Sequence, residues 1–203
     1  MGNRLLKIIM LKLKRIILYG TTISLLISCS YGNPKLHIAK NIKNNICRVA
    51  VIPFINHTNR QGISELITKV VISELIQSGV EVTEEGEIIR IIKRERYQII
   101  NSVPVKIIKK IGQELNVDAV IGGEVTKATK VGKHVCLGFF FWVRDAKNGQ
   151  FIWETYYIKN GEDYRKILHF GKVSSLSGLA QRMVHEVVRT SMKRSLFRCR
   201  VSS

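Results

Sequence analysis

The first 29 residues constrain this chain most, because they decide how much of it is left to fold and in which compartment. Five basic residues and no acidic residue precede thirteen uncharged residues, 16–28, and Cys29 follows directly. A basic start, an apolar core of about 7–15 residues and a small residue at its end describe a secretory signal peptide. We therefore predict that residues 1–28 are a leader, cleaved between Ser28 and Cys29.

The alternative for this segment is an uncleaved membrane anchor. A helix that spans a bilayer needs about 20 apolar residues. The uncharged stretch has thirteen, and Thr21, Thr22 and Ser24 make it less apolar still. Cleavage is therefore the better interpretation. The start stays open between Met1 and Met10, since a basic segment follows either methionine.

The run Leu26-Ile27-Ser28-Cys29 resembles the lipobox of bacterial lipoproteins. The resemblance implies that the Cys29 thiol receives a diacylglyceryl group, that an acyl chain such as palmitate is added, and that Cys29 becomes the first residue of the mature chain. Ser30, where an Asp would signal retention, implies the outer membrane, with the protein facing the periplasm. We expect no cofactor other than this covalent lipid.

Without its leader the chain has 175 residues, enough for one domain with its own core. The formal charge of +18 falls to +13. Such a basic chain suits nucleic acid, an anionic membrane or an acidic polymer. An exported chain rarely meets nucleic acid, and no helix-turn-helix or RNA-binding signature is present. We therefore expect no nucleic-acid partner and favour a cationic face near anionic lipid.

Positive charge gathers at the end of the chain. Cations suit the C-terminus of a helix, which explains part of this cluster. We also interpret it as a candidate contact with anionic lipid or lipopolysaccharide. Its members are Arg189, Lys193, Arg194, Arg198 and Arg200.

Hydrophobic periodicity divides the mature chain into a short tether with the lipidated cysteine (29–45), a periplasmic domain (46–195) and a basic tail (196–203). The pattern predicts strands at 46–54, 80–83, 118–126, 135–144 and 150–158 and helices at 61–77, 84–98, 104–115 and 176–192. A strand–helix–strand start followed by helices and a hairpin predicts an α/β fold: a three-layer mixed sheet with flanking helices.

Side chains for chemistry are scarce. His185 and Glu186 begin a metalloprotease-like pattern, but Arg189 stands where the second histidine is needed. We therefore predict no metal site and no catalytic residue. Three cysteines remain after Cys29, at positions 47, 136 and 199, without a C-x-x-C pair. We expect Cys47 and Cys136 to be buried; a disulfide is open in an oxidising compartment, but spacing does not give its partners.

Three runs carry a family resemblance: 49–56 (VAVIPFIN), 112–123 (GQELNVDAVIGG) and 143–153 (VRDAKNGQFIW). In this order they resemble the superfamily that includes the CsgG curli-secretion lipoprotein, the LpoB activator of a peptidoglycan synthase and the amino-terminal domain of TolB. The resemblance implies a TolB N-terminal-domain/CsgG-like fold. It also implies a non-enzymatic role in envelope assembly or secretion, through protein partners and with a homo-oligomer left open.

Two other functions were weighed. A curli-type secretion channel subunit needs additional membrane-crossing strands of about 9–11 residues. We find none beyond the core elements, and we interpret Phe139-Phe140-Phe141-Trp142 as a buried strand. The other function is a basic periplasmic domain that binds peptidoglycan or another acidic polymer, and the charge of the chain alone supports it.

Overall fold

The computed structural model describes residues 32–40, 46–97, 102–165 and 171–199. The predicted leader and Cys29 lie outside these residues. Residues 33–203 form one compact unit.

A single mixed sheet organises this unit, in the strand order β1-β7-β6-β5-β2-β4, and the short β3 also pairs with β5. β2 runs parallel to β4 and β5, whereas β5, β6, β7 and β1 pair antiparallel. The strands are β1 (His37–Ile38), β2 (Arg48–Val51), β3 (Ile55–Asn56), β4 (Glu81–Val82), β5 (Ala119–Val131), β6 (His134–Asp145) and β7 (Phe151–Asn160).

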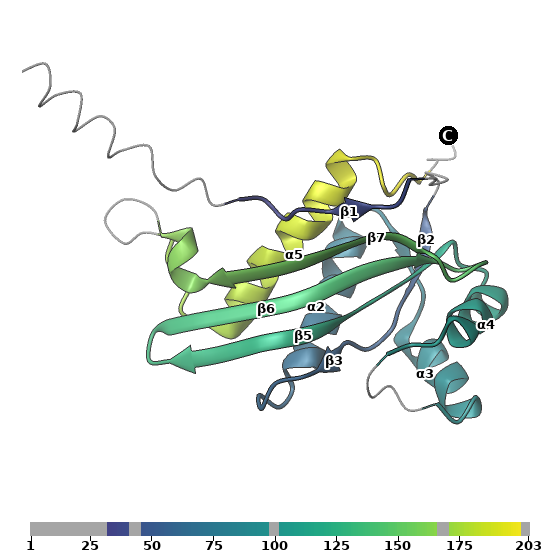
Figure 1. The fold of residues 1–203 in the computed structure, drawn as a ribbon, viewed down its shortest axis with the longest axis horizontal. Coiled ribbons are helices and arrows are strands. Elements are labelled where there is room, and N and C mark those ends of the chain that lie inside the picture. Colours follow the sequence, from purple (N-terminus) through teal and green to yellow (C-terminus); the bar gives the residue numbers. More distant parts are fainter. Residues whose placement is uncertain (1–31, 41–45, 98–101, 166–170, 200–203) are drawn as a thin grey trace, which may run out of the picture. The chain divides into compact units, whose positions relative to one another are not determined.

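Helices cover both faces of the sheet (Figure 1). α2 (Ile63–Gln77) and α5 (Leu176–Lys193) pack on one face. α3 (Glu85–Arg94) and α4 (Val105–Leu115) pack on the other. A short 3-10 helix, η1 (Gly161–Tyr164), follows β7. The three-layer α/β fold predicted from the sequence is confirmed.

α5 shows why the hydrophobic pattern predicted the helices well. Its buried side chains recur every three or four positions, from Leu176 through Met183 to Val188. Ser175 caps its start, because the Ser175 side chain accepts a hydrogen bond from the backbone N–H of Gly178 at 3.1 Å. An apolar stripe and a cap residue are both visible in sequence.

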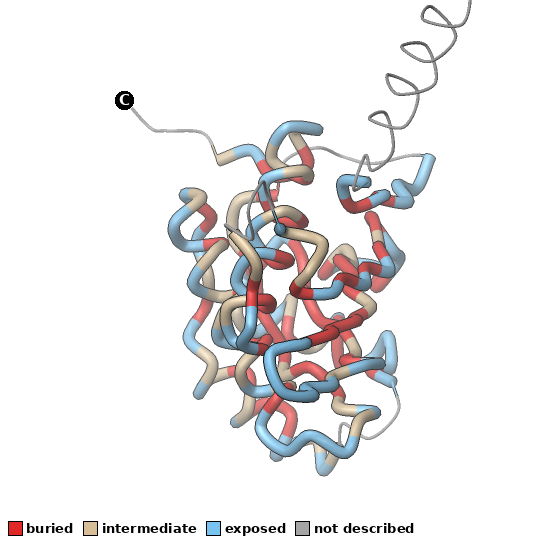
Figure 2. Tube along the Cα trace, turned by 90° about the vertical axis from the view of Figure 1, so that its left-hand side faces the viewer, coloured by how far each residue is buried: buried red, intermediate tan, exposed pale blue. Residues whose placement is uncertain are grey.

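The two faces of the sheet are buried to different extents. The core under α2 and α5 takes buried side chains from β2, β5, β6 and β7, whereas the core under α3 and α4 takes Ala50 of β2, Val120 of β5 and Trp142 of β6. Along β6, Phe139 and Phe141 are fully buried towards α5, and Phe140 on the opposite face is partly exposed. The prediction of a buried strand at 139–142 is therefore confirmed, with Phe140 as the exception. Figure 2 shows the buried residues enclosed by exposed turns and helix faces.

β5 continues past the predicted end at Thr126 to Val131. In this outer part its neighbour is β6 alone, since β3 pairs with β5 only as far as Val125 among the described residues. Residues 126–131 include the exposed Lys127 and Lys130, and they do not alternate between apolar and polar side chains. Only Ala128 in this part packs against the core under α2 and α5, so the alternation that identifies a strand in sequence is too weak to be recognised.

The folded domain also reaches into the predicted tether. β1 pairs with β7 at Glu154 and Trp153, and Leu36 just before it is buried in the core. The hydroxyl of Thr155 donates a hydrogen bond to the carbonyl oxygen of Lys35 at 2.8 Å. A two-residue edge strand leaves no periodic pattern in the sequence, so the boundary predicted at residue 46 falls about ten residues too late.

The predicted basic tail likewise belongs in part to the core. Leu196 and Phe197 are buried, and the Phe197 ring lies edge-on to the Trp153 ring at 6.3 Å. Two consecutive apolar residues after a helix are too short a signal to predict this packing.

Candidate functional site

The predicted site residues divide between described and undescribed parts of the chain. Ser28, Cys29 and Arg200 lie outside the described residues. Four members of the basic cluster are described and exposed: Arg189, Lys193, Arg194 and Arg198. Arg194 reaches back to the start of the domain, where its Nη1 donates a hydrogen bond to the carbonyl oxygen of Leu36 at 3.3 Å.

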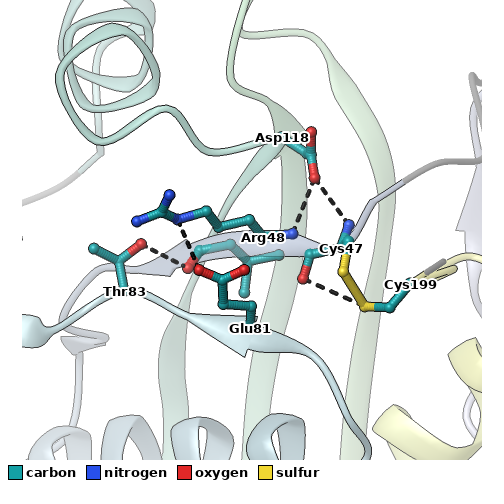
Figure 3. Close-up of polar contacts among 7 residues, drawn as sticks. Cys47, Arg48, Glu81, Thr83, Asp118 and Cys199 are labelled. Carbon is teal, nitrogen blue, oxygen red and sulfur yellow. Dashed lines mark hydrogen bonds and ion pairs between the residues drawn. A yellow bond between two sulfur atoms is a disulfide. The ribbon is translucent and has the colours of Figure 1, made fainter. Parts of the chain in front are cut away.

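A disulfide joins Cys47 to Cys199, with Cα atoms 4.6 Å apart across a sequence separation of 152 residues (Figure 3). It fastens the tail to the start of β2. Both cysteines are half-buried, in contrast to the burial predicted for Cys47, while Cys136 is buried as predicted and is a free thiol. The partners of the bond follow from strand order and tail packing, which spacing does not reveal.

Asp118 stabilises the strand next to this disulfide. Its Oδ2 accepts hydrogen bonds from the backbone N–H groups of Cys47 and Arg48, each at 2.9 Å. Arg48 pairs in turn with Glu81 of β4 at 3.2 Å. These side chains meet where β5, β2 and β4 begin (Figure 3). Asp118 lies in the run 112–123, and the structure gives it a positioning role.

A second polar cluster lies on α5. Glu186 accepts hydrogen bonds from the hydroxyls of Tyr157 and Tyr164, the latter at 3.0 Å. Burial raises the pKa of both tyrosines well above the usual value, and the nearby Glu186 carboxylate raises each pKa further. Both phenols are therefore protonated donors across the physiological range. The cluster ties β7 and η1 to the helix.

His185, next to Glu186, points elsewhere. Its Nδ1 lies 2.9 Å from Oε2 of Glu74 on α2. The two residues of the incomplete metalloprotease pattern thus serve different contacts. Among the described residues, no group of three side chains of metal-binding type gathers at one place. A surface groove of about 470 Å³ runs past this region, lined by Glu74, Tyr164, Gln181, Arg182, His185, Glu186 and Arg189.

The outer half of the β5–β6–β7 ribbon presents an uncovered face. Tyr156 and Ile158 of β7 are 53% and 41% exposed on the side away from α5, and Val131 at the hairpin tip is 76% exposed. Phe140 lies opposite Tyr156 in the strand register. We call Phe140, Tyr156 and Ile158 the open face. Large apolar groups left exposed together suit contact with another protein.

A small cavity of about 80 Å³ adjoins Phe140 at the inner end of this ribbon. The Arg144 guanidinium lies over the Phe151 ring at 4.1 Å and donates a hydrogen bond to the carbonyl oxygen of Val103 at 3.1 Å. Burial lowers the pKa of Arg144. The cation thus has aromatic and backbone partners of its own beside this cavity.

No protein-family model matches the chain, and no curated protein sequence matches it either. Solved structures do share its fold. The PelC dodecamer from Paraburkholderia phytofirmans is 18% identical with a TM-score of 0.55, covering 82% of this chain and 98% of that one. Lipoprotein GNA1162 from Neisseria meningitidis is 17% identical with a TM-score of 0.51, covering 72% of this chain and 99% of that one.

Proposed function

We propose that this chain is an exported lipoprotein, held by a lipid on Cys29 at the outer membrane and facing the periplasm. Its domain binds other envelope proteins, as a homo-oligomer, in envelope assembly or secretion. We assign the domain a binding role and no catalytic step.

The disulfide between Cys47 and Cys199 is the observation that carries the proposal. Disulfides persist in oxidising compartments such as the periplasm and are rare in the cytosol. The bond therefore supports export independently of the leader pattern. Both cysteines also lie beyond the predicted cleavage point, so the bond survives removal of the leader.

The lipid anchor rests on the lipobox-like run and gains support from the fold. GNA1162, which shares that fold, is a lipoprotein by its own description. In the described part of the chain, no helix is both long enough and apolar enough to cross a membrane. The relationship to CsgG, LpoB and TolB comes from the sequence motifs and stays a prediction.

Self-association is supported by two observations. PelC, with the same fold, is described as a dodecamer. On the open face, Tyr156 and Ile158 are exposed and Phe140 is partly exposed, so a second copy can cover these side chains. We propose this face as the contact between copies.

Cys29→Ala tests the anchor. We expect mass spectrometry of the native mature protein to show a lipid-modified Cys29 as the first residue, and the variant to lose both the lipid and cleavage. In-cell crosslinking of the native protein should capture copies of itself and envelope proteins. Cys136→Ala is the matched control, because its buried thiol should leave lipid and location unchanged. A native product with an intact leader or an unmodified Cys29 would refute the anchor.

A further inference from the structure

Both ends of the mature domain lack acidic residues. Residues 33–47 and 187–199 contain no Asp or Glu, although the whole chain has fifteen. Six basic residues in these two segments are exposed: Lys35, Lys40, Arg189, Lys193, Arg194 and Arg198. We call these six residues the basic edge.

The fold brings the two segments together. β1 joins the sheet beside β7, and the Arg194 side chain donates a hydrogen bond to the carbonyl oxygen of Leu36. The backbone N–H of Arg198 donates a hydrogen bond to the carbonyl oxygen of Ile46 at 3.0 Å. The Cys47–Cys199 disulfide locks the same region. Two basic segments about 150 residues apart in sequence thus lie together near the outer strand β1, with Arg189 one turn further back on α5, in the groove that Glu74 and Glu186 also line.

The two segments of the basic edge supply no carboxylate that could neutralise its cations. Among the described residues, none of its six cations forms an ion pair, whereas several cations elsewhere pair with glutamates, as Arg48 does with Glu81 and Lys69 with Glu65. The opposite edge of the sheet carries both signs of charge: Glu81 on β4 pairs with Arg48, and Glu84, Glu85 and Glu87 at the start of α3 are followed by Arg90, Lys93 and Arg94. The β1 edge differs because both of its segments are basic and contain no acidic residue.

The position of the basic edge relative to the anchor point indicates its partner. The compact unit starts at Asn33, four residues after Cys29. Four extended residues span at most about 14 Å. If Cys29 carries a lipid, the basic edge lies next to the bilayer surface. We infer that it rests on anionic phospholipid headgroups, which set the orientation of the domain on its membrane; this inference depends on the proposed lipid anchor.

The strength of this contact follows from the number of cations. Each Lys or Arg that lies within a Debye length of an anionic membrane raises the membrane partition coefficient of the protein about fivefold. Six cations are therefore sufficient to hold one edge of the sheet against the bilayer.

The test uses the mature chain from Ser30 onward, without lipid, because residues 33–203 form one compact unit. We would measure its sedimentation with vesicles of phosphatidylglycerol and phosphatidylcholine, and with phosphatidylcholine alone. The variant K35Q/K193Q/R198Q removes three exposed cations of the basic edge and spares Arg194, whose side chain holds Leu36. Its matched control, K127Q/K130Q/K133Q, removes three exposed cations from the β5–β6 hairpin.

We expect the native chain to bind only the anionic vesicles, the first variant to bind about 100-fold more weakly, and the control to change by a few-fold at most. Equal losses in both variants would overturn the inference, because net charge rather than the basic edge would then govern binding. No binding to anionic vesicles would also overturn it, as would binding to purified sacculi alone. Since the chain tested has no lipid, these results are separate from the mass of Cys29, which tests the anchor itself.

Discussion

Around the middle of β6 and β7, the two faces of the sheet differ in exposure, and neighbouring residues display the difference. On β6, Phe139 is fully buried towards α5, while Phe140 on the other face is partly exposed. On β7, Tyr157 is buried and bonded to Glu186, while Tyr156 is 53% exposed. Phe139 lies opposite Tyr157 in the register, and Phe140 lies opposite Tyr156.

This difference separates stability from recognition. The face under α2 and α5 is closed by the chain's own helices, tail and disulfide, so substitutions there should act on folding. The open face contributes little to the core, so substitutions there should act on contacts with other molecules. The same strands supply both faces, which makes adjacent residues natural matched pairs.

The largest effect is expected from Phe139→Ala. Truncating a fully buried phenylalanine costs about 3–5 kcal/mol of unfolding free energy, because a cavity replaces its contacts. Phe140→Ala, one residue away on the open face, should cost about 1 kcal/mol. Urea unfolding of both variants measures the contrast, and similar losses would show that the two faces are equally important to the core.

Replacing both Cys47 and Cys199 with serine should cost about 2–5 kcal/mol, because the bond closes a very long loop in the unfolded chain. Thermal and urea unfolding provide the measurement. Dithiothreitol supplies the control: it should destabilise the native protein and leave the double variant unchanged. A native protein indifferent to reduction would contradict the role of the disulfide in closing this face.

Glu186→Gln should cost about 1–3 kcal/mol, since it weakens two buried hydrogen bonds to a charged acceptor. The neighbouring His185→Gln changes an exposed contact with Glu74 and should cost at most about 1 kcal/mol. The two substituted residues are neighbours on α5, so each variant serves as the control for the other. If their unfolding curves coincide, the tyrosine cluster does not stabilise the closed face.

Alkaline pH should act on the same cluster. The folded protein holds the pKa of Tyr157 and Tyr164 above the unfolded value of about 10. Their contribution is fully present below pH about 10 and is lost as pH rises above it, because the unfolded chain then releases protons that the folded protein keeps. Absorbance of phenolate during a pH titration tests this; ionisation of every tyrosine near the usual pKa would contradict it.

The smallest effect on stability is expected at the open face. Tyr156→Ser with Ile158→Ser should change the unfolding free energy by about 0.5 kcal/mol or less. It should nevertheless reduce the mass of the proposed oligomer in light scattering. Ile76→Ser is the control, since Ile76 is 56% exposed on α2, away from this face. An unchanged mass in the double variant would rule out the open face as the contact between copies.

Sequence reasoning succeeded where a segment is long and one of its faces is covered. α5 was predicted almost to the residue because its buried stripe repeats over eighteen residues. The sequence-based prediction failed at β1, where two residues carry no period, and at the outer part of β5, where Ala128 alone packs against the core. These failures have one cause: hydrophobic patterning reports burial, and edges and extensions have little of it.

Some residues of the candidate site could be predicted from the sequence, and others could not. Arg189 and its neighbours were identified by composition, because charge is visible in sequence. Lys35 and Lys40 were missed as their companions, since only β1 pairing and the disulfide bring them to the same edge. Asp118 and Glu186 took structural roles that depend on which backbone groups and hydroxyls lie nearby. The sequence alone therefore did not show which residues, distant along the chain, lie close together in the fold.

The disulfide also gives the domain a mechanical property. A pull exerted through the proposed lipid, against a partner that holds the domain, loads the chain first at β1, whose two residues can separate from β7. The load then reaches Cys47, where the disulfide shares it with Cys199. Further extension must therefore detach β2 and the C-terminal segment together, so the domain resists tension in the envelope more strongly after β1 has separated than before.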